Sequence, residues 1–100
     1  MAKRKLPPTH PGEILREELE ERGISLNRLA RDTRIPLSRV SLIVNGKRAI
    51  SPDTALRLEF YFGASAQFWL NLQSAYDLAI ASEHADQIAG EVIPARKSAA

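Results

Sequence analysis

The chain has no cysteine, and this absence excludes several classes of protein. Without thiols it can form no disulfide framework, no cysteine nucleophile and no thiolate site for zinc or an iron–sulfur cluster, and it fits a reducing compartment. Histidine is nearly as scarce, since His10 and His84 are the only two and stand near opposite ends of the sequence. A metal site would need carboxylates that no spacing gathers beside them, so we expect no metal and no cofactor.

Long apolar runs are also missing. No segment approaches the roughly 18 apolar residues that a membrane-spanning helix needs. The basic residues 3–5 are followed by Leu6, two prolines, Thr9 and His10 rather than by the apolar region of a secretory signal. We therefore expect a cytoplasmic protein without a membrane partner.

Catalytic motifs are absent as well. The sequence contains no phosphate-binding glycine loop, no nucleophile elbow and no pair of carboxylates with an orienting group. A small ribonuclease would need histidine, lysine or tyrosine side chains placed as acid and base, and these residues are scarce. The sequence predicts a protein that is not an enzyme.

The charges that are present are unevenly distributed, although the formal net charge is only +2. From Ser25 to Arg48 there are six positive residues and one acid, whereas from Leu58 to Ala95 there are five acids and neither lysine nor arginine. A basic block suits the phosphates of a nucleic acid, and an acidic block suits a basic partner or serves solubility alone. The basic block contains Arg28, Arg31, Arg34, Arg39, Lys47 and Arg48.

With 100 residues, 44% of them hydrophobic, the chain is long enough for one small domain. Helix start and stop signals predict an all-α fold of five short helices. They run from Pro11 to Gly23, from Ser25 to near Arg34, from Pro36 to Asn45, from Ser51 to Gly63 and from Ser65 to Ser82. We expect this domain to span residues 9–82, with residues 1–8 as a flexible basic arm. Residues 83–100 are expected to be a frayed or disordered tail, because the apolar periodicity fades beyond Ser82.

The last predicted helix carries aromatic residues at helical spacing. Phe68, Leu72, Ala75, Tyr76 and Ala79 form one stripe, with Trp69 beside it. Such stripes are usually buried, either in the core or in a dimer contact. We assign Phe68, Trp69, Leu72 and Tyr76, together with Phe60 of the preceding helix, to a dimer or partner interface. The last helix would then be the dimerisation helix.

Two surface features leave alternatives open. Phe60 is expected to point outward beside Arg57; a single exposed apolar residue needs no explanation, yet beside Tyr61 it could widen an interface. The first predicted helix is crowded with acids, which form either a solvated face or a docking surface for a basic partner. These acids are Glu17, Glu18, Glu20 and Glu21.

The second and third predicted helices meet the requirements of a helix-turn-helix. The second helix of such a pair lies in the major groove of DNA, so its outer face cannot be acidic, and no acid occurs between Pro36 and Arg48. Hydroxyls and arginine can bond to base edges, and apolar side chains can touch a thymine methyl group. We expect base contacts from Leu37, Ser38, Arg39, Ser41 and Leu42, and phosphate contacts from Arg28, Asn45, Lys47 and Arg48. The alternative is a plain helical bundle whose outer face is merely solvated.

The joint pattern of residues 25–30 and 35–48, which read SLNRLA and IPLSRVSLIVNGKR, resembles the Xre-type helix-turn-helix family of phage repressors. The flanking segments narrow this resemblance. Residues 10–15, 46–51, 68–73 and 76–78 read HPGEIL, GKRAIS, FWLNLQ and YDL, and are similar to the HigA antitoxins, also named virulence-associated VapI proteins. The resemblance covers residues 9 to about 80. Leu37 and Leu42 differ from many repressors of this type, which carry amides at these positions.

This resemblance implies a five-helix, phage-repressor-like fold. It further implies a dimeric antitoxin that binds an inverted repeat in its operator DNA, neutralises a HigB-type ribonuclease toxin and represses the operon that the two proteins share. By position, Leu37, Ser38, Ser41 and Leu42 would face bases, while Asn45, Lys47 and Arg48 would hold the DNA backbone. Two alternatives remain, namely a stand-alone Xre-type repressor without a toxin, and an antitoxin that has lost DNA binding.

Overall fold

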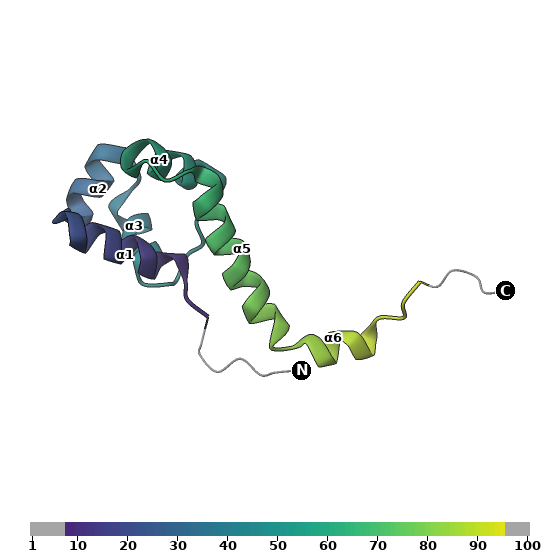
Figure 1. The fold of residues 1–100 in the computed structure, drawn as a ribbon. Helices are drawn as coiled ribbons and strands as arrows, with labels where there is room; N and C mark the ends of the chain where they lie inside the picture. The colour runs from purple at the N-terminus through teal and green to yellow at the C-terminus, as the bar shows by residue number, and fades with distance from the viewer. Residues whose placement is uncertain (1–7, 96–100) are drawn as a thin grey trace.

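The computed structural model describes residues 8–95, and this part of the chain forms six α-helices and no β-strand (Figure 1). The helices are α1 (Pro11–Arg22), α2 (Leu26–Thr33), α3 (Leu37–Val44), α4 (Pro52–Phe62), α5 (Ala66–Ser82) and α6 (Ala85–Glu91). The predicted all-α fold is confirmed, and the first five helices lie within two residues of their predicted bounds. The predicted number of five is wrong, because α6 follows them.

Helix α6 lies within residues 83–100, which the sequence analysis assigned to a frayed or disordered tail. Alanine and glutamine favour a helix there, and Asp86 lies in the first turn, where it complements the positive end of the helix dipole. Every residue of α6 is exposed in this structure, so it has no buried face to give the apolar periodicity that was searched for. Of the predicted basic arm, residues 1–7 lie outside the described part of the chain, as do residues 96–100.

The helix ends follow the predicted punctuation. His10, Ser25, Ser51 and Ser65 each accept a hydrogen bond from a backbone N–H of the helix that they precede. Pro36 is the N-cap of α3 rather than its first helical residue. These local signals fix where each helix begins, and tertiary packing then selects the buried face.

The core is formed by apolar side chains from α1 to α5 and from two of the loops between them. It consists of Leu15, Leu19, Leu29, Ile35, Val40, Ile43, Val44, Ile50, Ala55, Leu58 and Trp69. The predicted inner stripe of α5 needs a correction, since Trp69 and Gln73 are its buried residues, whereas Phe68 and Ala75 are exposed. The stripe was misplaced because a polar residue, Gln73, occupies a buried position.

Helices α1 to α4 and the first half of α5 pack together, and α5 then extends away from them with α6 beyond its far end (Figure 1). Helix α3 contacts α1 and α2, while α4 contacts α2 and α5. The longest helix, α5, has 17 residues, and nothing within residues 8–95 has the length and apolar character needed to cross a bilayer. The fold therefore places α3 in contact with both of its neighbours α1 and α2, and leaves the end of α5 projecting.

Candidate nucleic-acid interface

Helices α2 and α3 are joined by a three-residue turn, residues 34–36. Arg34 adopts the left-handed conformation (φ 59°) that ends α2, at a turn where such motifs often carry glycine. Ile35 follows it into the core, and Val40, Ile43 and Val44 hold the inner face of α3 against the same core. This is the arrangement of a helix-turn-helix, in which the second helix presents its outer face to DNA.

The five predicted base-contacting residues all lie on α3 and outside its fully buried face. Leu37, Ser38 and Leu42 are exposed, while Arg39 and Ser41 are half-buried. The structure therefore brings hydroxyl, guanidinium and apolar groups together on one helix surface. These are the groups that can bond to base edges or touch a thymine methyl group.

Arg39 has an acid as a neighbour across the α3–α4 junction. Arg57 donates a hydrogen bond from Nε to Asp53 Oδ1 at 2.7 Å, and this bond, followed by the charges of Arg57 and Arg39, lowers the pKa of Asp53. The carboxylate of Asp53 is therefore ionised at neutral pH. Arg39, the only charged residue among the five predicted base contacts, therefore has a weak attraction to Asp53.

The C-terminus of α3 is closed by a group of hydrogen bonds that the sequence analysis did not foresee. Arg16 of α1 donates from Nη2 to Val44 O at 3.0 Å and to Asn45 Oδ1 at 2.9 Å, and Asn45 donates from Nδ2 to Ser41 O at 2.9 Å. The amide of Asn45, a predicted phosphate contact, is thus used within the protein to end α3. Arg16 places a positive charge at the negative end of the helix dipole. Its position in the middle of an otherwise acidic stretch of α1 was the signal that could have identified it.

The loop after α3 carries the other predicted phosphate contacts. Gly46 is left-handed (φ 74°) and Lys47 N donates to Leu42 O at 2.8 Å, so the chain turns sharply out of the helix. Lys47 and Arg48 are exposed, and within residues 8–95 neither has an ion-pair partner. Their charges are free to meet an anion.

Arg28, the predicted phosphate contact on α2, is exposed but shares its charge with an acid. Its Nε lies 3.4 Å from Asp32 Oδ2, and Tyr61 of α4 donates from its hydroxyl to the same oxygen at 2.8 Å. The hydrogen bond from Tyr61 is the main cause that lowers the pKa of Asp32. This exposed pair is weak enough for Arg28 to exchange Asp32 for a phosphate.

Gln73 of α5 holds the far end of the loop that follows α3. Its Oε1 accepts a hydrogen bond from the buried Ile50 N at 2.8 Å, and its Nε2 donates to Asp77 Oδ1 at 3.0 Å. The loop bearing Lys47 and Arg48 is thus attached to α5 at Ile50, three residues after Lys47. The sequence analysis missed Gln73, because a buried amide has no signature in apolar periodicity.

His10 joins the start of α1 to α5. Its Nδ1 accepts a hydrogen bond from Gly12 N at 2.9 Å, and its ring meets the Tyr76 ring edge-on at 4.8 Å between centroids. Burial lowers the pKa of His10, although Asp77 and Glu13 oppose this shift. The neutral form is the one that can accept the Gly12 bond. A Cβ on Gly12 would lie only 1.8 Å from Ile43 O, so α1 and α3 approach too closely here for any side chain.

The five predicted interface residues occupy different environments. Trp69 is 1% exposed and belongs to the core of the single chain, which is the first of the two alternatives, core or dimer contact, that its stripe left open. Leu72 packs against that core, and Tyr76 against His10. Phe60, 84% exposed on α4, and Phe68 on α5 are the exposed members. No cluster of three potential metal ligands occurs in the part of the chain that the structure describes.

Comparison with known proteins gives this arrangement a family. The sequence pattern of the helix-turn-helix family matches residues 15–69. Virulence-associated protein I of Dichelobacter nodosus is 49% identical over 87 residues, which cover 86% of this chain and 81% of that protein.

Two solved structures are similar over nearly the whole chain. An addiction module antidote protein of the HigA family from Coxiella burnetii is 49% identical with a TM-score of 0.83, over 90% of this chain and 100% of that chain. The Pseudomonas aeruginosa antitoxin HigA, solved with the higBA promoter, is 49% identical with a TM-score of 0.83. The match covers 89% of this chain and 99% of that chain. The resemblance found in the sequence is confirmed, and the chain belongs to the helix-turn-helix family, among the HigA antitoxins and virulence-associated I proteins.

Proposed function

We propose that the chain is a sequence-specific DNA-binding antitoxin, which represses its own toxin–antitoxin operon and neutralises a HigB-type ribonuclease toxin. The observation that carries DNA binding is the acid-free outer face of α3, which is followed by Lys47 and Arg48, two exposed residues without an ion-pair partner in the described part of the chain. The kinship with HigA proteins, one of them solved with promoter DNA, supports the operator and the toxin as partners. The proposal requires no catalytic group and no cofactor.

Dimerisation through α5 would set two copies of α3 about 34 Å apart, one turn of DNA, so that they read an inverted repeat. Phe68 is exposed on α5, and Leu72 and Tyr76 of the same helix are only partly buried. These apolar surfaces support the assignment of α5 as the dimerisation helix. Each α3 alone reads only a few base pairs. We therefore expect the dimer to contribute more to operator affinity than any one base contact.

The test is fluorescence anisotropy of the purified protein with DNA from upstream of its own gene, against scrambled DNA, at two salt concentrations. We expect tighter binding to the upstream fragment and weaker binding at high salt. Binding no better than to scrambled DNA, even at low salt, would leave α3 as scaffold and refute the repressor role.

Two variants separate the base contacts from the phosphate contacts. Replacing both Ser38 and Ser41 by alanine should reduce the preference for the operator over scrambled DNA. Lys47→Ala should weaken binding to both DNAs alike and reduce the salt slope by about 1. A Lys47→Ala protein that changed sequence preference alone would contradict the placement of this loop on phosphate.

The toxin half of the proposal has its own test. A stand-alone repressor is the rival function, since the matched helix-turn-helix segment, residues 15–69, by itself requires no toxin. The purified antitoxin should bind the product of a small toxin gene beside its own and stop that protein from cleaving RNA. An intact operator affinity without any toxin binding would favour the rival.

A further inference from the structure

Asp32 is an acid among the basic residues of the helix-turn-helix. It is the one negative residue between Ser25 and Arg48, a segment with six positive residues. It lies in the last turn of α2, where the helix dipole is negative and a positive side chain would be favoured. This position gives α2 no stability, so the reason for an acid here lies in its contacts.

The carboxylate of Asp32 holds two arginines of its own helix, one on each oxygen. Its Oδ2 lies 3.4 Å from Nε of Arg28, and its Oδ1 lies 3.4 Å from Nε of Arg31. Tyr61 of α4 donates its hydroxyl to Oδ2 at 2.8 Å and so fixes the carboxylate in place. Asp32 therefore gathers two guanidinium groups that are three residues apart on α2.

Both arginines are open to solvent and to an exchange of partner. The side chains of Arg28 and Arg31 are 52% and 72% exposed, whereas that of Asp32 is 31% exposed. Ion pairs this exposed contribute at most about 1 kcal/mol, so another anion can replace the carboxylate. A phosphate is such an anion, because its oxygens accept charge-assisted hydrogen bonds from guanidinium groups.

Helix α2 lies beside α3, and the first helix of a helix-turn-helix crosses the DNA backbone (Figure 1). Exposed arginines on α2 are therefore suited to phosphates rather than to bases. We propose that Arg28 and Arg31 together form a binding site for DNA phosphate, and that Asp32 occupies this site until DNA replaces it. The inference rests on the proposed DNA-binding function, and it adds Arg31 to the phosphate contacts.

Asp32 then limits the affinity of the chain for DNA. Each arginine must leave the carboxylate before it binds a phosphate, and the negative charge of Asp32 also repels the DNA backbone. Both effects act on phosphates, which every DNA sequence carries, so they are independent of sequence. Asp32 thus lowers the sequence-independent part of the affinity and leaves the base contacts of α3 unchanged.

Fluorescence anisotropy tests the site with the upstream fragment and with scrambled DNA over a series of salt concentrations. The site variants are Arg31→Ala, Asp32→Asn and their combination. The matched controls are Arg22→Ala and Glu18→Gln, which make the same changes of charge in an i,i+4 ion pair of α1, where Arg22 Nε lies 2.7 Å from Glu18 Oε2.

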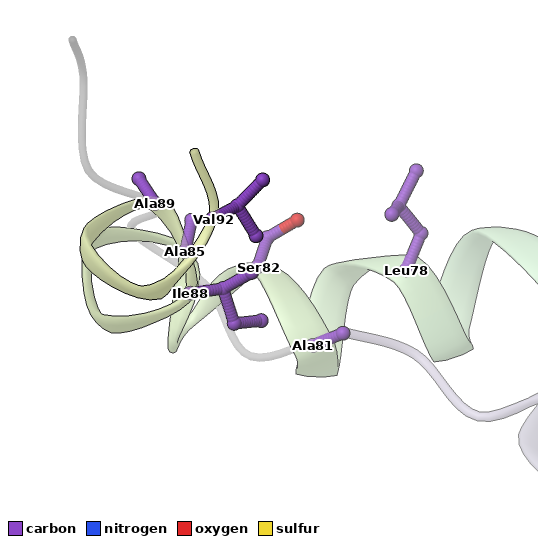
Figure 2. Close-up of a pocket in the computed structure, with 7 residues that line it drawn as sticks. All are labelled: Leu78, Ala81, Ser82, Ala85, Ile88, Ala89 and Val92. Atoms are coloured by element: carbon purple, nitrogen blue, oxygen red, sulfur yellow. The ribbon is translucent and has the colours of Figure 1, made fainter. Parts of the chain in front are cut away.

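The fold and the dimer of each variant are checked separately. Urea denaturation followed by the fluorescence of the buried Trp69 shows whether a variant is folded. The substitutions lie on α1 and α2, away from the projecting end of α5 and α6, where Figure 2 shows apolar side chains such as Leu78 and Ile88 (Figures 1 and 2). We therefore expect sedimentation to show the same dimer for every variant.

Asp32→Asn should bind scrambled DNA at least about threefold more tightly at low salt, with a salt slope steeper by about 1. Arg31→Ala should weaken binding to both DNAs alike. This weakening should be at least about threefold larger in the Asp32→Asn background, because Arg31 no longer shares its charge with a carboxylate there. The two α1 controls should stay within about twofold of the wild type.

Three results would overturn the inference. If Arg31→Ala has the same effect with and without Asp32→Asn, Asp32 acts only as a distant charge. If Asp32→Asn does not tighten binding to scrambled DNA, or if Glu18→Gln tightens it equally, Asp32 does not occupy a phosphate site. If the wild type binds neither DNA at low salt, the site and the proposed function fail together. Equal wild-type affinity for both DNAs would refute the repressor role alone, since scrambled DNA still reports on the phosphate site.

Discussion

Replacing Gln73 by leucine should destabilise the fold by about 2 kcal/mol and loosen the DNA-binding loop. The change leaves a side chain of similar size but removes the acceptor of the Ile50 N–H, which lies 2.8 Å away in a residue only 2% exposed. A buried donor left unsatisfied costs about 1–3 kcal/mol. The lost bond to Asp77 adds less, because Asp77 is exposed and water can replace the amide.

Urea denaturation followed by tryptophan fluorescence measures this loss directly. Trp69 is the only tryptophan of the chain and is buried in the core, so its emission reports global unfolding. With a slope of about 1–2 kcal/mol per molar urea, the midpoint of Gln73→Leu should fall by about 1–2 M. The matched control is Gln67→Leu, the same chemical change at an exposed position of α5, which should stay within about 0.5 kcal/mol of wild type.

The same variant should weaken DNA binding while the protein is still folded. The loop after α3 is attached to α5 through the Ile50 bond, and Lys47 and Arg48 depend on that loop for their position. We expect operator affinity of Gln73→Leu to fall several-fold at a temperature where fluorescence shows a folded core. Equal urea midpoints and equal operator affinities for Gln73→Leu and Gln67→Leu would refute the reasoning.

Two further perturbations test the contacts that fix the start of α1 against α3 and α5. Gly12→Ala should destabilise the fold by about 3 kcal/mol or more and weaken operator binding, because its Cβ would meet the backbone of α3 at 1.8 Å. Gly90→Ala, at a glycine of α6 with nothing within 4 Å, is the control and should be neutral or stabilising. Stability should also fall as pH drops below about 6.5, because burial lowers the pKa of His10 and the unfolded chain then binds the proton more readily. The stability that neutral His10 contributes is fully lost below the lowered pKa of His10. Urea midpoints measured between pH 5 and 7.5 should show this loss in the wild type. They should not show it in His10→Asn, whose side chain does not titrate but retains an acceptor that can cap α1.

The helix-turn-helix could be predicted because its signals are local. Ser25 is the N-cap of α2, Pro36 is the N-cap of α3, and Asn45 with Gly46 ends α3. Each acts through the backbone of its immediate neighbours. The apolar spacing of α3 then indicated which of its faces is buried. With the buried face known, the outer face and its base-contacting candidates followed.

The contacts that position α3 could not be predicted because they join distant residues. Arg16 reaches Val44 across 28 positions, and Gln73 reaches Ile50 across 23. Both are polar side chains that bond to backbone groups, so neither contributes to an apolar pattern. For the same reason the apolar spacing of α5 placed Phe68 and Ala75 in the inner stripe, whereas the buried residues of this helix are Trp69 and the polar Gln73.

The structure divides α5 into two parts with different constraints. In its first part Trp69 fills the core, Gln73 holds the loop after α3, and Tyr76 contacts His10, so a change there acts on the fold and on the DNA-binding loop together. In its last part Leu78 is exposed and lies outside the core. Because the fold does not account for the apolar side chains of that last part, a partner is the physical explanation for them.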